Sequence, residues 1–232
     1  MIDVHSHILP CMDDGSQSVE ESLRMLAASA AQGILKVAAT PHFYPMENDI
    51  EHFLERRKAA VMELRTLMQP GIPELLLGAE IFYFDGMSHV PELGLLRIEG
   101  TPFLLIEMPF SSWSERVVRE IANINLWPGV SVVLAHIERY LSFPDNKAWL
   151  SELRDAGILM QSNADFFLRW RSRYRALRML KHGEIHLLGS DCHNMGSRAP
   201  HLGEALRVIG PAGRQMLENT LEGLLPEPAE RR

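Results

Sequence analysis

The chain has 232 residues, of which 46% are hydrophobic and 23% charged, and this composition excludes a disordered, collagen-like or low-complexity protein. Its formal charge of −7 argues against bulk electrostatic binding of nucleic acid or anionic membrane. Two cysteines cannot form a disulfide framework, and no apolar run approaches the ~20 residues that span a bilayer. We therefore expect a cytoplasmic protein that does not span a membrane, with a single domain over residues 1–224 and a flexible tail over residues 225–232.

Short apolar segments bounded by turns predict seven β-strands. Most of these segments are almost entirely apolar, which is typical of strands buried on both faces of a parallel sheet. The predicted strands cover residues 2–4, 34–40, 74–81, 103–108, 130–135, 158–162 and 185–189.

Helical patterns fill the intervals between these strands. The first helix is the clearest, because Ser18 and Glu21 form a capping box and Gly33 follows as a C-cap. Later helices are predicted over residues 49–69, 114–125, 145–156, 166–181 and 197–208. Seven βα units in one chain favour an α/β fold with a closed or nearly closed parallel barrel over a doubly wound sheet.

Polar side chains stand at the ends of six of the seven predicted strands. The carboxyl ends of parallel strands converge on one face of a barrel, so residues as distant in sequence as His5 and His193 could share one pocket. Residues two apart on an extended chain point to the same side, and the pairs His5/His7 and Asp191/His193 have this spacing. The strand-end residues are His5, His7, His42, Glu80, Glu107, His136, Asp191 and His193.

Two of these residues, Glu80 and Glu107, follow long apolar runs. A buried carboxylate is costly unless a cation compensates it, and few lysines or arginines lie in these strands. Bound metal therefore explains two such carboxylates among five imidazoles better than salt bridges do. The remaining histidines are expected to be surface or hydrogen-bonded residues: His52, His89, His182, His186 and His201.

The chain also carries short motifs in a fixed order, at residues 3–7 (DVHSH), 13–15 (DDG), 40–42 (TPH), 78–80 (GAE), 106–107 (IE), 135–136 (AH), 138–140 (ERY) and 189–194 (GSDCHN). Together they resemble the polymerase and histidinol phosphatase (PHP) superfamily. More narrowly, they resemble the PHP-type protein-tyrosine phosphatases of bacterial capsule and exopolysaccharide systems. The resemblance covers residues 1 to about 200 and implies a distorted seven-stranded (β/α)7 TIM-like barrel, the PHP fold, with up to three divalent metal ions, most often Mn²⁺.

Residue by residue, the resemblance implies nine metal ligands. One ion would be held by His5, His7, Glu80 and Asp191; a second by Glu80 as a bridge with Glu107 and His136; and a third by Asp14, His42 and His193. Asp13 competes with Asp14 for its role. The resemblance also places Arg139, Arg198 and His136 among the catalytic residues, with the two arginines on the phosphate.

This ligand set has imidazoles and carboxylates but no thiolate, which suits Mn²⁺, Zn²⁺ or Fe²⁺. Three divalent ions would outweigh the four ligand carboxylates by two positive charges, which attracts a phosphate dianion. Such ions lower the pKa of a bound water from 15.7 toward ~7, so metal-activated hydroxide is the expected nucleophile. A phenolate leaves more readily than a serine alkoxide, which favours phosphotyrosine. We expect a metal-dependent protein-tyrosine phosphatase, and the resemblance implies that it acts on the autophosphorylated, tyrosine-rich tail of a bacterial tyrosine kinase.

Two other functions stay open at this point. One is a small-molecule phosphatase of the histidinol-phosphatase type, and the other is a metal-stabilised binding module without turnover. The chain departs from the family at Ile137, where relatives usually have proline, and at residues 163–165 (Asn-Ala-Asp), which lack the glycine and serine expected after the sixth strand. Both changes bear on the substrate rim. A cysteine mechanism is a further alternative, because Cys192 precedes Arg198 by the six residues typical of cysteine-dependent phosphatases, although the adjacent Asp191 disfavours a thiolate.

Residues 166–181 interleave aromatic and basic side chains. In a chain of net negative charge we expect a solvated helix face with some core aromatics, or alternatively a dock for an acidic peptide. Residues 43–50, which follow His42, are expected to form either a mobile lid or an ordinary surface loop.

Overall fold

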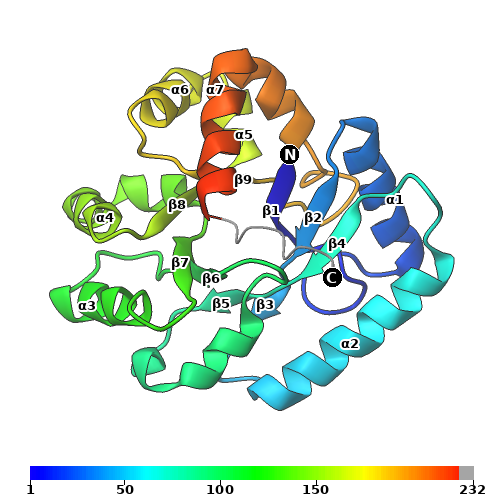
Figure 1. Cartoon of the computed structure of the whole chain (residues 1–232), viewed down its shortest axis with the longest axis horizontal. Coiled ribbons are helices and arrows are strands. Elements are labelled where there is room, and N and C mark those ends of the chain that lie inside the picture. Colours follow the sequence, from blue (N-terminus) through cyan, green and yellow to red (C-terminus); the bar gives the residue numbers. More distant parts are fainter. Residues whose placement is uncertain (225–232) are drawn as a thin grey trace, which may run out of the picture.

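The computed structural model describes residues 1–224, and the predicted flexible tail 225–232 lies outside the described residues. Short parallel strands occupy the middle of the molecule and helices surround them (Figure 1). The strands are β1 Ile2–Ser6, β2 Lys36–Ala39, β3 His42–Phe43, β4 Glu74–Leu77, β5 Glu80–Phe82, β6 Phe103–Glu107, β7 Ser131–Leu134, β8 Leu159–Asn163 and β9 Leu187–Gly189. The α-helices are α1 Val19–Ala31, α2 Ile50–Leu67, α3 Glu115–Ile124, α4 Asn146–Asp155, α5 Ala164–Leu168, α6 Arg173–Lys181 and α7 Leu202–Leu224; the 3-10 helices are η1 Met87–His89, η2 Pro91–Leu96 and η3 Ile137–Ser142.

The strands form two parallel sheets. One has three strands in the order β1-β2-β4, and the other has six in the order β3-β5-β6-β7-β8-β9, curled into a half-barrel. The predicted parallel α/β architecture is therefore confirmed. The seven-stranded ring is not seen as one continuous sheet, because the predicted strand 74–81 is divided and a separate short strand follows the predicted strand 34–40.

These two interruptions lie side by side. The chain leaves β2 at Ala39 and resumes as β3 at His42, while the predicted strand 74–81 divides into β4 and β5. Pro41 has no amide hydrogen for the ladder, and a Cβ on Gly78 would lie 2.9 Å from Cγ1 of Ile98. Pairing resumes beyond the break with His42 opposite Glu80. The interruption therefore places these two polar residues next to each other.

The segment after β9 packs against β1. The amide of Asp191 donates to the carbonyl of His5 at 2.8 Å, and the amide of His7 donates to the carbonyl of Cys192 at 2.9 Å. Gly189 permits this approach, because a Cβ there would collide with the Cβ of His5. The first and last strands thus bring His5, His7 and Asp191 together.

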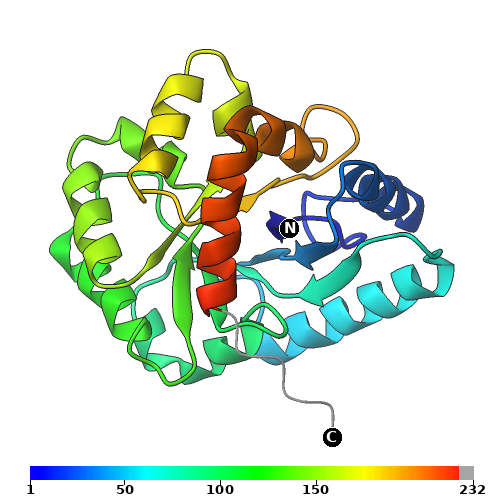
Figure 2. The same cartoon turned by 45° about the horizontal axis from the view of Figure 1, so that its top comes forward.

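Apolar residues form two clusters. The larger cluster packs the helices against the strands. The smaller one takes side chains from the same face of strands in both sheets, including Val4, Ala38, Val133 and Leu187, and Leu221 of α7 joins it. Figure 2 shows α7 lying across the strands. This packing fills the middle of the strands, so the polar residues are concentrated at their carboxyl ends.

Four of the predicted helices are confirmed as α1 to α4, and Ser18 caps α1 by accepting a hydrogen bond from the amide of Glu21. The prediction of one helix over residues 166–181 is wrong, because the chain leaves helical geometry between α5 and α6. The helix predicted over residues 197–208 is longer than expected. It continues through a kink at Gly210, whose φ of 75° suits glycine, and Pro211 then begins the second half.

Within residues 1–224, no helix is both long enough and apolar enough to cross a bilayer.

Candidate metal centre

The nine predicted ligands all lie at the ends of strands or in the loops beside them. They come from segments spread over the whole chain, as the sequence predicts. Eight of the nine are buried or nearly so, and Asp14 is the exception, with 65% of its side chain exposed. Three groups have ligand atoms within 4.8 Å of one another: His5/His7/Glu80, His7/Asp14/His42/His193 and His42/Glu80/Glu107. These groups contain seven of the nine side chains, and His136 and Asp191 lie beside them. The role of all nine as ligands stays a prediction.

The first group is centred on a carboxylate oxygen. The Nε2 atoms of His5 and His7 lie 3.1 Å apart, and each is within 3.2 Å of Oε2 of Glu80. Oδ1 of Asp191 lies 3.5 Å from Nε2 of His7. When both rings are neutral and their Nδ1 atoms donate to Gln161 and Asp13, the two Nε2 lone pairs face each other. A divalent ion would accept both lone pairs and compensate the buried carboxylate.

The second group lies nearer the surface. Oδ1 of Asp14 is 3.3 Å from Nε2 of His193 and 3.6 Å from Nε2 of His42. Within residues 1–224, Nε2 of His193 and Nδ1 of His42 are buried and have no hydrogen bond of good geometry. A buried polar atom without a partner is costly, and a metal ion bound to it would remove that cost.

The third group connects the centre to β6 and β7. Nε2 of His136 lies 2.9 Å from Oε1 of Glu80 and 3.1 Å from Oε1 of Glu107, and Nδ1 of His42 lies 3.1 Å from Oε2 of Glu80. Glu80 therefore reaches both neighbouring groups with its two oxygens. This is the arrangement expected of a carboxylate that bridges two ions.

Asp13 and Asp14 differ sharply in their surroundings. Oδ2 of Asp13 accepts from Nδ1 of His7 at 2.7 Å and from the amide of His42 at 2.8 Å, while its Oδ1 accepts from the amide of Gly15. Its oxygens are thus engaged in orienting the two histidines. Of the two, Asp14 is the acid whose side chain reaches the group of potential ligands.

The sequence interpretation missed two buried polar residues of β8. Oε1 of Gln161 accepts from the amide of His136 at 2.7 Å and lies 3.2 Å from Nδ1 of His5. Nδ2 of Asn163 donates to Oδ2 of Asp191 at 2.7 Å, and Gln161 donates to Asn163. These amides hold three potential ligands in place. The signal was available, because Gln-Ser-Asn ends an otherwise apolar strand.

The two predicted arginines form ion pairs with the two carboxylate oxygens of Asp191. Arg139 Nη2 lies 2.5 Å from Oδ2 of Asp191, and Arg198 Nη2 lies 2.8 Å from Oδ1. Both guanidinium groups are partly exposed and line a cavity of about 360 Å³ next to Asp191, together with Arg169 and Ser172. This cavity is open to solvent on one side and reaches the centre on the other.

Buried charges shift several pKa values in this centre. Burial alone would lower the pKa of His7, but the carboxylates of Asp13 and Glu80 outweigh burial and raise it to about 10. His136 responds in the same way to Glu107 and Glu80, and its pKa rises to about 9. Burial and the neighbouring His7 lower the pKa of His193 to about 4. The carboxylates therefore attract cations strongly, whereas His193 offers a neutral lone pair.

Two predicted ligands occupy unusual backbone conformations. His136 has a φ of 34° and Asp191 a φ of 51°, in the left-handed region that residues with a side chain rarely adopt. Such conformations cost about 1 to 3 kcal/mol and persist where the surrounding structure enforces them. Here the hydrogen bonds from the amide of His136 to Gln161 and of Asp191 to the carbonyl of His5 do so.

The structure does not favour a cysteine mechanism. Cys192 is buried in the larger apolar cluster, and burial together with the carboxylate of Asp3 raises the pKa of its thiol. A nucleophilic cysteine needs a lowered pKa and access to substrate.

Two aromatic rings flank the centre. The ring of Phe110 is stacked near His136 and Tyr140, each at 5.8 Å between centroids, and the guanidinium of Arg139 lies 5.8 Å from the Phe110 centroid. The ring of Tyr44 stacks on His42 at 5.1 Å. Phe110 keeps 49% of its surface exposed, so its free face is available for an apolar group.

The basic and aromatic run at residues 166–181 separates into core and surface. Phe166 and Phe167 are buried, whereas Trp170 and Tyr174 are largely exposed. Arg169 pairs with Asp165, and Arg171 lies over the ring of Trp170. This distribution agrees with the predicted solvated helix face that carries some core aromatics.

Comparison with known proteins agrees with this geometry. Tyrosine-protein phosphatase YwqE of Bacillus subtilis (strain 168) is 32% identical over 100% of this chain and 98% of its own. Tyrosine-protein phosphatase CpsB of Streptococcus pneumoniae is 31% identical over 90% of this chain and 89% of its own.

Solved structures show the same relationship. A crystal structure from work on YwqE from Bacillus subtilis and CpsB from Streptococcus pneumoniae, described as unique metal-dependent tyrosine phosphatases, superposes with a TM-score of 0.80 at 30% identity over the whole of both chains. A candidate histidinol phosphatase, hisK from Listeria monocytogenes, shares the fold, with a TM-score of 0.50 at 9% identity over 83% of this chain and 95% of its own. The family model for capsular polysaccharide synthesis, CpsB/CapC, matches residues 1–227, and the chain therefore belongs to the CpsB/CapC family.

Proposed function

We propose that this protein is a metal-dependent protein-tyrosine phosphatase of capsule or exopolysaccharide synthesis. The observation that carries the proposal is the convergence of five imidazoles and four carboxylates beside two arginines that line an open cavity. Its family and the names of its relatives support the same activity. Residues 1–224 would act as a single catalytic domain.

The nine predicted side chains fit divalent ions. Opposed lone pairs on His5 and His7, and the unpartnered nitrogens of His42 and His193, are what a metal ion would satisfy. We propose up to three ions held by the ligands that the sequence predicts, with Asp14 rather than Asp13 in the outer group, and Mn²⁺ as the native ion. Bound ions would supply Lewis-acid activation of water and neutralise phosphate charge. The protein's own residues then decide what is bound and in which orientation.

The two arginines would bind the phosphate. In the structure both guanidinium groups form ion pairs with the carboxylate of Asp191, as they would with a phosphate. If Asp191 held a cation, donors of Arg139 and Arg198 would be available for phosphate oxygens, which the planar fork of arginine suits. Asn163 would position Asp191, because its amide donates to Oδ2. His136 would act as a ligand whose backbone is held by Gln161.

Phe110 would receive the tyrosyl ring. It lies beside Arg139, so a phosphate on that arginine places an attached phenyl ring near the exposed face of Phe110. Its loop is rigid, because Nδ2 of Asn146 donates to the carbonyl of Ser111 and the hydroxyl of Tyr140 accepts from the amide of Met108. Aromatic pairs add about 0.5 to 1.5 kcal/mol beyond burial, which favours an aryl over an alkyl phosphate.

Further parts of the assignment are proposals as well. The hydrogen bonds between the β1 and β9 ends support the view that the two sheets together form a distorted seven-stranded barrel. Free Cys11 and Cys192 fit a cytoplasmic protein. A phosphotyrosyl protein, the tyrosine-rich tail of a bacterial tyrosine kinase, is the proposed substrate.

Metal replacement tests the proposal directly. The protein is stripped with chelator, restored separately with Mn²⁺, Zn²⁺, Fe²⁺ or Mg²⁺, and assayed for phosphate release from a phosphotyrosyl peptide and from histidinol phosphate. We expect metal-dependent release from the peptide, loss of release in His136→Ala, and retention in Cys192→Ser. Activity that ignores chelator and vanishes in Cys192→Ser would overturn the proposal. Preference for histidinol phosphate would instead identify a small-molecule phosphatase.

A further inference from the structure

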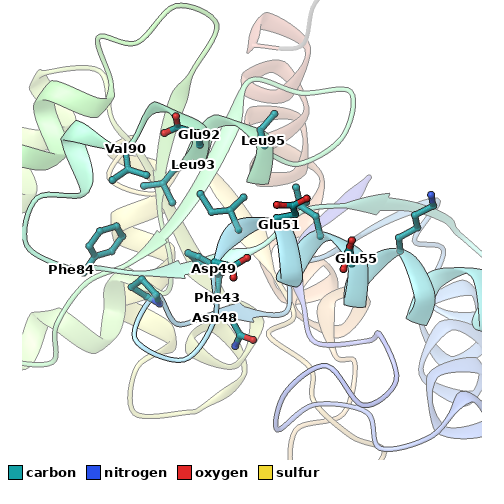
Figure 3. A pocket seen from close by; sticks show the side chains of 14 residues that line it. Phe43, Asn48, Asp49, Glu51, Glu55, Phe84, Val90, Glu92, Leu93 and Leu95 are labelled. Carbon is teal, nitrogen blue, oxygen red and sulfur yellow. The ribbon is translucent and has the colours of Figure 1, made fainter.

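A wide apolar groove lies beside the segment that carries His42 (Figure 3). Its volume is about 790 Å³, which makes it larger than the cavity next to Asp191. One side is formed by the first half of α2 and the other by residues 84–95, which include η2. Its apolar surface comes from Phe43, Ile50, Leu54, Phe84, Leu93 and Leu95. Neither the metal centre nor the arginines use this groove.

The groove has a floor of buried side chains and a solvent-exposed edge. Phe43 and Leu93 are buried, whereas Leu95 keeps 62% of its surface in solvent. Ile50, Leu54 and Phe84 are partly buried and pack on the core. Contiguous apolar surface of this kind, bordered by polar residues, is typical of an interaction site.

The charge of the border specifies the occupant. Asp49, Glu51, Glu55 and Glu92 line the groove, and Lys58 is the one basic residue among its lining. Asp49 caps α2 by accepting from the amide of His52, but the three glutamates form no ion pair within residues 1–224. A partner that brings lysine or arginine would complement them.

The pattern favours a peptide over a small molecule. Small-molecule sites place a few polar groups among apolar walls to fix orientation, whereas the charged side chains here are at the border and nearly all acidic. An apolar floor between charged borders is the arrangement that binds an amphipathic segment through its apolar face.

The groove is one strand away from the metal centre. Side chains alternate along β3, so His42 belongs to the centre while Phe43 belongs to the groove. His42 and Phe43 are adjacent in the chain, and an extended linker of about ten residues spans roughly 33 Å, so a linker of this length is suited to connect the two places. A single substrate chain can therefore occupy both places.

We propose that this groove binds an apolar segment flanked by lysine or arginine in the phosphotyrosyl protein that the centre dephosphorylates. The proposal rests on the proposed function for the identity of the partner. Its effect is to raise the local concentration of a phosphotyrosine connected to that segment.

Binding is tested without catalysis. A labelled helical peptide of about 14 residues, with leucines on one face and lysines beside them, is titrated with protein and followed by fluorescence anisotropy. Leu95→Asp and the double variant Glu51→Lys/Glu55→Lys should each weaken binding at least about tenfold, and added salt should weaken binding to the wild type. Glu63→Lys on the same helix and Leu126→Asp on another exposed site are the matched controls and should bind as the wild type does. Equal binding by all variants would overturn the proposal.

Turnover tests the connection to the substrate. The same leucine and lysine segment is joined through about ten glycine and serine residues to a phosphotyrosine, and compared with the phosphotyrosyl part alone. The joined peptide should have a KM about tenfold lower at unchanged kcat, and Leu95→Asp should abolish the difference. Equal KM values in the wild type would overturn the proposal. Phosphate release from the phosphotyrosyl part alone reports separately on the proposed function.

Discussion

Nδ1 of His7 and Oδ2 of Asp13 lie 2.7 Å apart, in a buried hydrogen bond that turns Nε2 of His7 toward Glu80. A carboxylate bound to the far nitrogen of a metal-ligating histidine fixes the orientation of the ring and raises its basicity. The neighbouring Asp14 points to solvent and to His193 instead. Two adjacent acids thus have different tasks.

Substitution of these two acids should give different metal-binding defects. Asp14→Asn removes a ligand, so we expect the protein to bind one ion fewer. Asp13→Asn leaves the ligands in place but weakens the hydrogen bond that orients His7. The affinity for metal should therefore fall roughly 10- to 100-fold, with the same number of ions bound. Elemental analysis of dialysed protein across a range of Mn²⁺ concentrations measures both, with the exposed Asp155→Asn as control. Identical behaviour of the two variants would contradict the assignment.

Removal of metal should lower stability, because the buried carboxylates then lose the cations that compensate them. A ligand at 100 times its Kd stabilises the folded state by about 2.7 kcal/mol, which corresponds to a Tm rise of roughly 5 to 10 °C for a chain of this size. Differential scanning calorimetry with chelator and with excess Mn²⁺ measures the change. Glu80→Gln should lose most of the metal-dependent rise in Tm, and Glu63→Gln should keep it. A Tm that is the same with and without metal in the wild type would count against a metal centre.

Lysine should not replace arginine beside Asp191. Arg139→Lys keeps the charge but loses the planar fork, so kcat/KM for a phosphotyrosyl peptide should fall about 100-fold. Arg198→Lys should behave in the same way, while Arg171→Lys, which lies over Trp170 outside the cavity, should retain activity. Steady-state kinetics on metal-loaded protein provide the comparison. Full activity of both lysine variants would remove the arginines from the phosphate site.

Phe110→Ala should reduce the preference for aryl over alkyl phosphates by roughly 2- to 12-fold, the range that one aromatic contact supplies. Inhibition by phenylphosphonate and by methylphosphonate isolates this effect from leaving-group chemistry. The Ki for phenylphosphonate should rise while that for methylphosphonate stays constant, and Phe110→Tyr should resemble the wild type. A parallel rise in both Ki values would indicate that Phe110 acts only by positioning Arg139.

His186 should make stability depend on pH. Its Nδ1 accepts from the amide of Met160 at 2.9 Å, and burial with nearby Arg154 lowers its pKa. The unfolded chain then binds the proton more readily, so this contribution is complete above about pH 6.5 and is lost as pH falls below it. Urea unfolding in chelator should show the wild type losing its advantage over His186→Gln between pH 7.5 and 5.5. A difference that is constant with pH would contradict the shift.

Much of the site follows from the sequence, because ligands at strand ends need only the correct strands and a parallel arrangement. His5, His136 and Asp191 are predicted in this way and lie together in the structure. The supporting amides were not found, because Gln161 and Asn163 read as ordinary polar residues until a neighbouring strand supplies their partners. The geometry also separates Asp13 from Asp14, which sequence spacing alone cannot do.

The fold was predicted less completely for related reasons. At Pro41 and Gly78 the strand pairing stops at the same level in two neighbouring strands. This is a tertiary relationship, and no single segment of the sequence reveals it. A proline in the sequence usually indicates the end of a helix. In α7, however, Pro211 is the first residue of the second half, directly after the kink at Gly210. The groove beside α2 has no sequence motif, because its lining comes from two separate stretches, residues 43–58 and 84–95.

The left-handed backbone at His136 and Asp191 has a consequence for how the proposed ions exchange. Tertiary hydrogen bonds already impose these conformations on the polypeptide, so arrival of a cation has little chain ordering left to accomplish. Replacement of one divalent species by another would then require no refolding. Occupancy by the proposed Mn²⁺ would then depend on its cellular supply, because Mn²⁺ is the weakest binder in the inherent ranking of these metals.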